Sequence, residues 1–193
     1  MPCISPILYL SCICLLVVVI ILLILQLTFY FRLLQIDEMT SIKNYRGFQK
    51  ISKKIIRQHK KKNTSLSLAI IDIDEFRNYN IDSYAFGDCV LKNFVTFISQ
   101  QIPNNAYFAR FRFGDEFILI LPCDLTTSLK VINELQTKCR ENNFVCLQNQ
   151  RTFNIRFSYG IALFETTDDS MERLLINAEK ALKENKINAA KYE

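Results

Sequence analysis

The sequence predicts an α/β (α+β) fold: a ferredoxin-like or polymerase-palm sheet with flanking helices, preceded by one transmembrane helix. Two observations support this prediction. An uncharged apolar run fills residues 7–31 and is long enough to cross a bilayer. After it, the residue patterns follow the order helix, strand, helix, hairpin, helix, strands, helix, which suits a mostly antiparallel sheet with helices packed on it.

The apolar run has few polar side chains, namely Ser11, Gln26 and Thr28. A signal peptide or a buried core helix is the weaker interpretation, because the run is longer than a cleaved apolar region and no basic residue precedes it. Lys and Arg residues follow the run closely, so the positive-inside rule places the C-terminal part in the cytoplasm. We therefore expect a single-pass protein of the inner (cytoplasmic) membrane. Its expected parts are a short extracytoplasmic end at 1–6, the transmembrane helix at 7–31, a short linker at 32–36 and one domain at 37–193.

The domain begins with helix-forming composition over 43–62, where apolar residues recur at helical spacing. An apolar, β-rich run at 65–73 then has the pattern of a buried central strand. The remaining expected elements are a helix at 87–101, strands at 107–113 and 117–122 around a tight turn at 114–116, a helix at 128–142, strands at 144–147 and 153–164, and an amphipathic helix at 171–186.

The net charge of +5 comes largely from the stretch 53–62, KKIIRQHKKK. Such a run can be a nucleic-acid patch, an anionic-lipid patch or a solvated helix face. No aromatic residues alternate with the charges, so we expect no nucleic-acid partner. The solvated face is favoured, and the nearby membrane span makes lipid contact the alternative. The seven cysteines form no Cys-x-x-Cys pair, and their spacing supports neither a metal site nor a disulfide framework.

Four acidic residues are expected to converge: Asp72 and Asp74 at the end of the central strand, and Asp115 and Glu116 in the neighbouring hairpin turn. Carboxylates clustered at adjacent strand ends are the hard oxygen ligands that Mg²⁺ or Mn²⁺ prefers. Such ions bridge triphosphate oxygens and neutralise the charge that develops in phosphoryl transfer, so the pattern fits nucleotidyl transfer. For any single Asp-x-Asp, ordinary polar turn residues are the simpler interpretation.

Further motifs strengthen the interpretation, because they occur in a fixed order along the chain. They are DEMTSIKNYRGF (37–48), DIDEFRNYN (72–80), FGDCVL (86–91), FGDEF (113–117) and FSYGIA (157–162). In this order they resemble the GGDEF diguanylate cyclase family, whose corresponding motifs are DxLTGLxNRRxF, DxDxFKxxN, GDxxL, GGDEF and SxGxA. The resemblance runs from Asp37 to about Asn188, which is essentially the whole soluble part.

The resemblance implies a metal-dependent nucleotidyltransferase. In the family pattern, the residues that hold Mg²⁺ or Mn²⁺ correspond to Asp72, the backbone carbonyl of Ile73, Asp115 and Glu116, the last two being the catalytic residues. The implied reaction condenses two GTP to cyclic di-GMP. Each domain of a homodimer would supply one half of the site.

The resemblance also implies how the substrate is bound. Asn80 and Asp88 match the pair that reads guanine, and a carboxylate can accept from guanine N1–H and N2–H₂, donors that adenine does not present together. GTP is therefore favoured over ATP. The remaining implied substrate contacts are the backbone near Phe76 and Arg77, Gly114 in the signature turn, and Lys186 on the triphosphate.

Several positions depart from the family pattern. Phe113 stands where the signature has its first glycine, and a phenyl side chain there can block the close approach of a nucleotide. Ala189, Ala190 and Lys191 stand where the family has Gly-Arg-Asn, so a second phosphate-binding cation is missing. These departures keep open a second hypothesis, a catalytically degenerate GGDEF domain that binds GTP or a partner protein without turnover. A packing scaffold is a third and weaker alternative, because packing gives no reason for acids to cluster.

Overall fold

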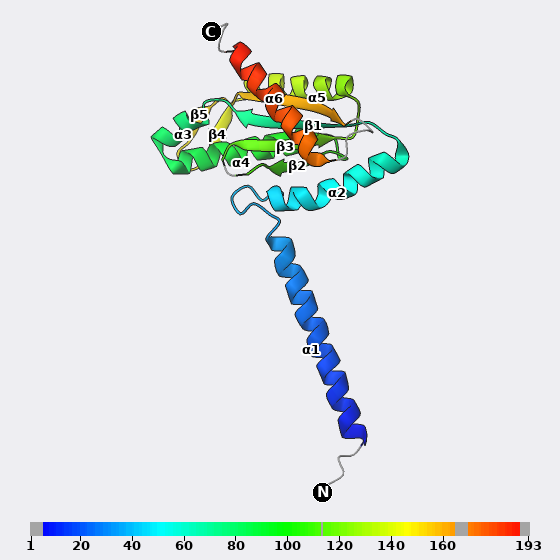
Figure 1. Cartoon of the computed structure of the whole chain (residues 1–193). Coiled ribbons are helices and arrows are strands. Elements are labelled where there is room, and N and C mark those ends of the chain that lie inside the picture. The colour runs from blue at the N-terminus through cyan, green and yellow to red at the C-terminus, as the bar shows by residue number, and fades with distance from the viewer. Residues whose placement is uncertain (1–5, 113, 165–169, 190–193) are drawn as a thin grey trace.

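The computed structural model describes residues 6–112, 114–164 and 170–189. The long helix α1 (Pro6–Leu33) extends away from one side of the domain and does not pack against the sheet or the helices that cover it (Figure 1). None of its side chains from Leu8 to Leu33 is buried, and this segment is long and apolar enough to cross a membrane, judged by length and composition. It is the one helix with these properties among the residues that the structure describes.

A four-stranded antiparallel sheet forms the centre of the domain, with the strand order β2-β3-β1-β6. The strands are β1 (Leu66–Ile73), β2 (Tyr107–Arg110), β3 (Glu116–Leu121) and β6 (Phe157–Phe164). Seven of the eight residues of β1 are buried, because both faces of this strand are covered by helices. A separate ribbon pairs β4 (Phe144–Cys146) with β5 (Arg151–Phe153). The predicted fold class is confirmed.

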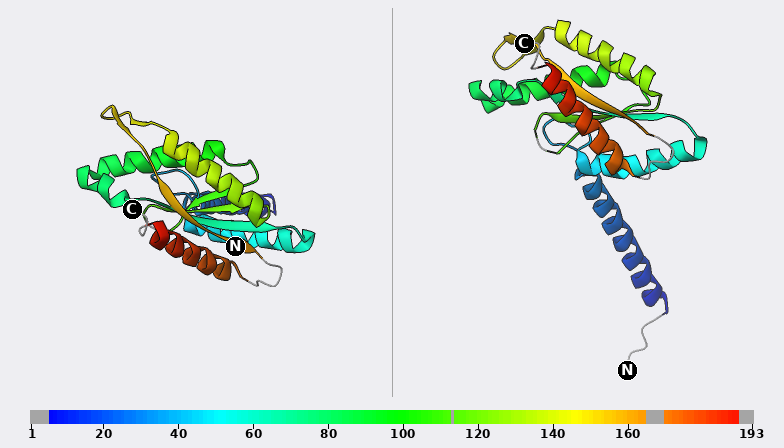
Figure 2. Two further views of the ribbon diagram at one scale, coloured as in Figure 1. Left: turned by 90° about the horizontal axis from the view of Figure 1, so that it is seen from above. Right: turned by 45° about the horizontal axis from the view of Figure 1, so that its top comes forward.

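Helices cover the two faces of the sheet (Figures 1 and 2), namely α2 (Tyr45–Lys62), α4 (Tyr84–Gln101), α5 (Leu125–Glu141) and α6 (Met171–Ala189). The short helix α3 (Phe76–Asp82) lies beside α4 at one end of the domain. Because side chains alternate along a strand, β1 contributes to two cores. Ile71 packs with α4 and α5 on one face, and Ile70 packs with α2 and α6 on the other.

The structure differs from the sequence expectations at several elements. Helix α3 was not predicted; it follows Glu75, whose backbone is left-handed at φ 54°. Helix α4 begins at Tyr84 rather than near residue 87, because Ser83 Oγ accepts from the Phe86 amide and caps it earlier. The single strand expected over 153–164 is divided between β5 and β6.

Gly160 sets the position of α6. A Cβ at this residue of β6 would collide with the backbone nitrogen of Leu182 and the carbonyl oxygen of Ala178, both on α6. The helix backbone therefore lies directly on the strand, an approach that only glycine permits. The consequence for the site is that the C-terminal half of α6 is fixed over the end of β1 and β6.

Cys89 of α4 and Cys146 of β4 form a disulfide, with Cα atoms 6.0 Å apart. This corrects the expectation from cysteine spacing, because the two residues are 57 positions apart and share no local motif. Disulfides are rare in reducing compartments, so a cytoplasmic domain would hold the two buried cysteines as adjacent thiols.

The segment 34–44, here called the strap, joins α1 to α2 and is fixed at both ends. Asn44 caps α2, since its Oδ1 accepts from the Gly47 amide at 3.0 Å. Its Nδ2 donates to the carbonyls of Leu34 at 3.0 Å and Ile36 at 3.1 Å. The carbonyl of Lys43 accepts from the backbone of Arg110 in β2 at 2.8 Å. The strap therefore connects the end of α1 to both α2 and the sheet.

Asn44→Ala should lower the free energy of unfolding by about 1–2 kcal/mol, because the helix cap and two further hydrogen bonds are lost together. Asn44→Asp keeps the capping oxygen but not the amide donor, so it should lose roughly half as much. Thermal melting of the full chain in detergent, followed by circular dichroism, measures both. Equal stability of Asn44→Ala and the unchanged chain would contradict this role.

Candidate functional site

Three of the four predicted acids meet across two neighbouring strands. Asp72, near the end of β1, is the direct cross-strand partner of Glu116, the first residue of β3. Asp115 precedes Glu116, and its carbonyl accepts from the Ile73 amide at 3.3 Å. Residues opposite each other in an antiparallel pair have Cβ atoms about 5 Å apart, so the carboxylates share one edge of the sheet. Glu116 lies in the strand rather than in the turn where it was expected.

Asp74 lies at the same end of the sheet and contacts the segment that leads into β6, on the opposite side of β1 from β3. Its amide donates to the carbonyl of Arg156 at 2.9 Å, and its Oδ1 accepts from Ser158 Oγ at 2.6 Å. Ser158 in β6 is itself the cross-strand partner of Asp72. The structure thus brings all four predicted acids to one end of the sheet.

Crowding of the acids changes their protonation equilibria. Burial, and then the charge of Asp72, raise the pKa of Asp115 and of Glu116 above their usual values. Burial also raises the pKa of Asp74, although the Ser158 hydrogen bond and the charge of Lys186 oppose it. A raised carboxyl pKa means that the ionised form is disfavoured in the folded protein. The edge is therefore a place where a cation would be stabilised.

Lys186 is the cation that the chain itself places there. Its Nζ lies 2.5 Å from Asp72 Oδ1, and the Asp72 side chain is only 15% exposed. The lysine side chain is 41% exposed, so the ammonium group is also accessible from solvent. It lies on the part of α6 that Gly160 positions. The predicted phosphate contact is therefore beside the predicted metal ligands.

Helices α3 and α4 bring together the residues predicted to read the base. Asn80 lies directly against Gly87 in the first turn of α4, so close that a Cβ at Gly87 would collide with Asn80 Oδ1. Asp88 follows Gly87 and is exposed. Phe76 and Arg77 begin α3, where the first N–H groups of a helix have no acceptor within it. These free donors fit the predicted phosphate contact.

The signature turn requires a glycine at position 114. Its φ of +120° is a conformation that L residues rarely adopt, although a Cβ would meet no atom within 4 Å. Backbone conformation, rather than space, therefore explains Gly114. Phe113, on which the steric expectation depends, lies outside the described residues, as do Ala190 and Lys191.

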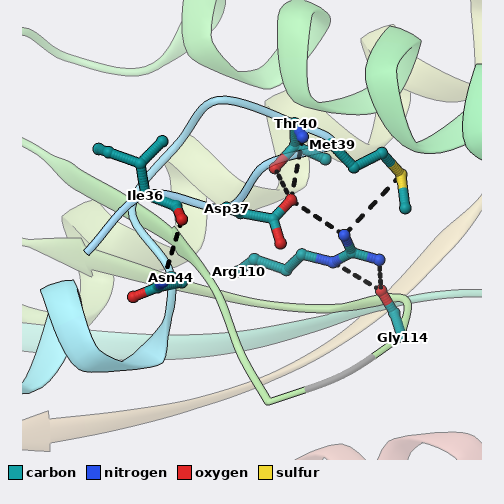
Figure 3. A network of polar contacts seen from close by, with 7 residues as sticks. All are labelled: Ile36, Asp37, Met39, Thr40, Asn44, Arg110 and Gly114. Carbon is teal, nitrogen blue, oxygen red and sulfur yellow. Dashed lines mark hydrogen bonds and ion pairs between the residues drawn. The ribbon is translucent and has the colours of Figure 1, made fainter. Parts of the chain in front are cut away.

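Arg110 is a residue of the site that the sequence reasoning missed (Figure 3). Its Nε and Nη2 donate to the carbonyl of Gly114 at 2.9 Å and 2.7 Å, and its Nη1 donates to Asp37 Oδ1 at 3.0 Å. The same Asp37 oxygen accepts from the amide and the hydroxyl of Thr40. A charged residue between apolar neighbours in a predicted strand was the available signal. The side chain ties the strap to the signature turn.

This network determines the charge state of Asp37. Burial alone would raise the pKa of Asp37, but hydrogen bonds from Thr40 and Arg110 outweigh it, so the pKa lies below the ordinary value of 3.8. The carboxylate is therefore ionised when it pairs with Arg110. Because the Arg110 side chain is 9% exposed, solvent screens this ion pair little.

The acids at this end of the sheet are oxygen donors of the kind that Mg²⁺ and Mn²⁺ prefer. Within residues 6–112, 114–164 and 170–189, no three His, Cys, Asp or Glu side chains are placed to hold a metal ion by themselves. Mg²⁺ is usually bound by one or two carboxylates together with substrate phosphates rather than by a cage of protein ligands. Asp72, Asp115 and Glu116 are hard oxygen donors; burial and the charge of Asp72 disfavour the ionised forms of Asp115 and Glu116, and Asp72 is paired with Lys186. They fit a metal ion that is shared with a nucleotide.

The sequence over residues 34–191 matches the family described as diguanylate cyclase, GGDEF domain. The chain belongs to the GGDEF domain family. Uncharacterized membrane proteins of Staphylococcus aureus are similar to it; the one from strain USA300 is 29% identical over 141 residues, covering 71% of this chain. The chain spans 38% of that relative's length.

Solved structures of GGDEF domains have the same fold. The coiled coil and GGDEF domain of DgcB from Caulobacter crescentus, in complex with c-di-GMP, superposes with a TM-score of 0.80 at 19% identity, covering 92% of this chain and 94% of that one. The GGDEF domain of TpbB (YfiN) from Pseudomonas aeruginosa gives 0.72 at 25% identity, covering 79% and 89%. The predicted family and fold are thereby confirmed.

Proposed function

We propose that this GGDEF protein is a membrane-anchored diguanylate cyclase that condenses two GTP molecules to cyclic di-GMP. The supporting observation is the meeting of Asp72, Asp115 and Glu116 at one sheet edge, with Lys186 beside them. Membership of the GGDEF domain family supports this reaction class. The carboxylates at this end of the sheet are oxygen donors suited to metal-dependent phosphoryl transfer.

In this proposal Asp72, the carbonyl of Ile73, Asp115 and Glu116 would hold Mg²⁺ or Mn²⁺ together with the GTP phosphates. A bound divalent ion would offset the charge that develops on the transferring phosphoryl group. Lys186 Nζ, 2.5 Å from Asp72, would exchange that carboxylate for a phosphate oxygen. The backbone at Gly114, and the N–H groups of Phe76 and Arg77, would position the triphosphate.

Asn80 and Asp88 would select guanine, because their side chains offer acceptors for its N1–H and N2–H₂ groups. Their proximity through Gly87 supports this assignment. Cyclic di-GMP contains two phosphodiester bonds. Each forms when the 3′-hydroxyl of one nucleotide attacks the α-phosphate of the other, and each releases one pyrophosphate. One domain with one site holds one GTP, so the proposal requires a homodimer.

Helix α1 would cross the cytoplasmic membrane once and leave the GGDEF domain in the cytoplasm. Its length and composition support this, as do the membrane-protein relatives in Staphylococcus aureus. The basic residues that follow α1 agree with a cytoplasmic domain.

The test is incubation of the detergent-purified full chain with GTP and Mg²⁺ or Mn²⁺, followed by chromatography of the products. Cyclic di-GMP and pyrophosphate are expected from GTP, and no cyclic product from ATP. GTP that is bound but unconverted under all of these conditions would refute the cyclase. It would favour the second candidate function, a degenerate domain that binds GTP and signals without turnover. The observation that favours this alternative is Phe113 in place of glycine.

Phe113→Gly should raise cyclic di-GMP formation by about 10- to 100-fold, because removal of the phenyl group restores the close approach that a misplaced substrate loses. Phe113→Ala should give a smaller gain, since it removes the ring but keeps a Cβ. Initial rates at saturating GTP measure both. Unchanged or lower rates in both variants would contradict a steric role for Phe113.

A further inference from the structure

Helix α2 has one strongly basic face. Its members, Lys50, Lys53, Lys54, Arg57 and Lys61, recur at helical spacing and are all exposed. We call these five residues the basic face. Together with Gln58 they line a shallow hollow of about 400 Å³. The opposite side of the helix, with Phe48, Ile55 and Ile56, is buried in the core.

Helix α2 itself contains no acidic residue; Glu172 of α6 lines a neighbouring hollow together with Lys53 and Arg57. Residues 45–62 contain eight of the chain's 24 Lys and Arg residues and no Asp or Glu. Among the described parts of the chain, none of the ion pairs involves a member of the basic face. Like charges at this spacing repel each other, so the face gains from an external anionic surface.

The position of α2 relative to α1 says where such a surface would be. Helix α2 lies across the side of the domain from which α1 leaves, between the sheet and α1 (Figures 1 and 2). Because the apolar side of α2 contacts the sheet, the basic face points away from the sheet, toward the side along which α1 runs. If α1 crosses a membrane, the basic face is directed at that membrane.

The strap prevents α2 from moving freely away from α1. The amide of Asn44 donates to the carbonyl of Gln35 at 3.1 Å, two residues beyond the end of α1. A Cβ at Gly47 would lie 2.5 Å from the same carbonyl, so the first turn of α2 packs directly on the strap. The potential of an anionic membrane surface falls off over about 8–10 Å at physiological ionic strength. The short strap can hold α2 within that distance of the end of α1.

We propose that the basic face docks on the headgroups of anionic phospholipids in the membrane that α1 crosses, and that this contact fixes the orientation of the GGDEF domain. The proposal rests on the proposed membrane insertion of α1. The long side chains of lysine and arginine suit the contact, because their aliphatic parts cover the helix while the charges reach phosphate groups. We name an anionic lipid as the partner because the basic face is positively charged and because the membrane that α1 would cross is the surface beside it.

The chain contains no tryptophan, so Gln58→Trp introduces a single fluorescent reporter beside the basic face. The full chain is placed in nanodiscs of phosphatidylcholine, alone or mixed with phosphatidylglycerol, with a nitroxide quencher attached to the lipid headgroup. Quenching should be several-fold stronger in the anionic nanodiscs and should weaken as salt is added.

Two matched proteins complete the test. Exchange of Lys50, Lys53, Lys54 and Arg57 for Gln in the Gln58→Trp chain should remove the difference between the two lipids. Glu134→Trp, at an exposed position of α5 far from α1 in Figure 1, should be quenched weakly in both. Equal quenching of Gln58→Trp in both lipids, unchanged by the four substitutions, would overturn the proposal and leave a solvated face.

Failure of membrane anchoring would be recognised separately. A chain whose α1 inserts elutes with phosphatidylcholine nanodiscs whether or not the basic face docks. A chain that does not elute with them refutes the anchoring part of the proposed function, and with it the geometric basis for docking. The yield of cyclic di-GMP from GTP remains an independent readout of the cyclase.

Discussion

Asp115→Asn should abolish cyclic di-GMP formation and at the same time make the domain harder to unfold. The loss of activity should be about 100-fold or more, the effect of removing one electrostatic group from a phosphoryl-transfer site. The gain in stability follows from the site itself, because burial and the charge of Asp72 raise the pKa of Asp115. An amide of the same shape carries no charge and ends that repulsion.

The raised pKa of Asp115 determines how the stability of the domain should change with pH. A carboxyl group whose pKa is raised by folding binds its proton more tightly in the native state, so stability falls as the pH rises through the folded pKa. At neutral pH Asp115→Asn should therefore melt a few degrees above the unchanged chain. Below the ordinary pKa of 3.8, where both states are protonated, the difference should disappear.

Circular dichroism melting of the full chain in detergent at neutral and acidic pH measures the stability, and product chromatography measures the activity. Glu134→Gln removes an exposed carboxylate of α5 and should alter neither. A lower melting temperature of Asp115→Asn at neutral pH would show that the acid stabilises the turn instead. Such trade-offs between stability and activity are common where acids are crowded for function.

The sequence predicted best what depends on local pattern. The buried run of β1 and the turn before β3 identified the sheet, and register then placed Asp72 opposite Glu116. Helix α3 was missed because its seven residues are too few to show a period, and its start depends on the left-handed backbone of Glu75. Short polar helices of this kind are set by tertiary contacts rather than by propensity.

The parts of the structure that escaped prediction depend on contacts between distant segments. Arg110 contacts Asp37 across 73 positions, and Cys89 pairs with Cys146 across 57. Neither pair has a spacing rule that a single sequence can display. Lys186 was found only because a family motif contains it; its contact with Asp72 spans 114 positions. Motif resemblance thus supplied residues, whereas the structure supplied the network that positions them.

Arg110→Ala should destabilise the domain strongly, because Arg110 is a buried charged residue beside the signature turn. The substitution removes two hydrogen bonds to the Gly114 carbonyl and leaves Asp37 without its ion-pair partner. Removal of one partner of a buried ion pair typically costs about 3 kcal/mol or more. For a domain of this size, the melting temperature should fall by roughly 6–12 °C. Arg110→Lys keeps the charge but not the forked geometry, so it should recover only part of the loss.

The neighbouring Arg112 provides the matched control. Its Nη2 lies 2.9 Å from Glu179 Oε1, but the arginine side chain is 59% exposed, and such pairs contribute little to stability. Arg112→Ala should therefore melt close to the unchanged chain. Comparable losses in the two variants would mean that the hairpin needs positive charge in general rather than the network of Figure 3.

Acid titration separates the ion pair from the carbonyl contacts. The pKa of Asp37 is depressed in the folded protein, so its contribution to stability is present above the unfolded pKa and is lost as the pH falls through the folded one. The difference in melting temperature between the unchanged chain and Arg110→Ala should therefore become smaller well below pH 3.8. It should not vanish, because the hydrogen bonds to Gly114 do not titrate. A difference that vanishes completely would assign the whole effect to Asp37. A difference that stays constant would assign it to the Gly114 carbonyl, and the strap would then have no energetic connection to the signature turn.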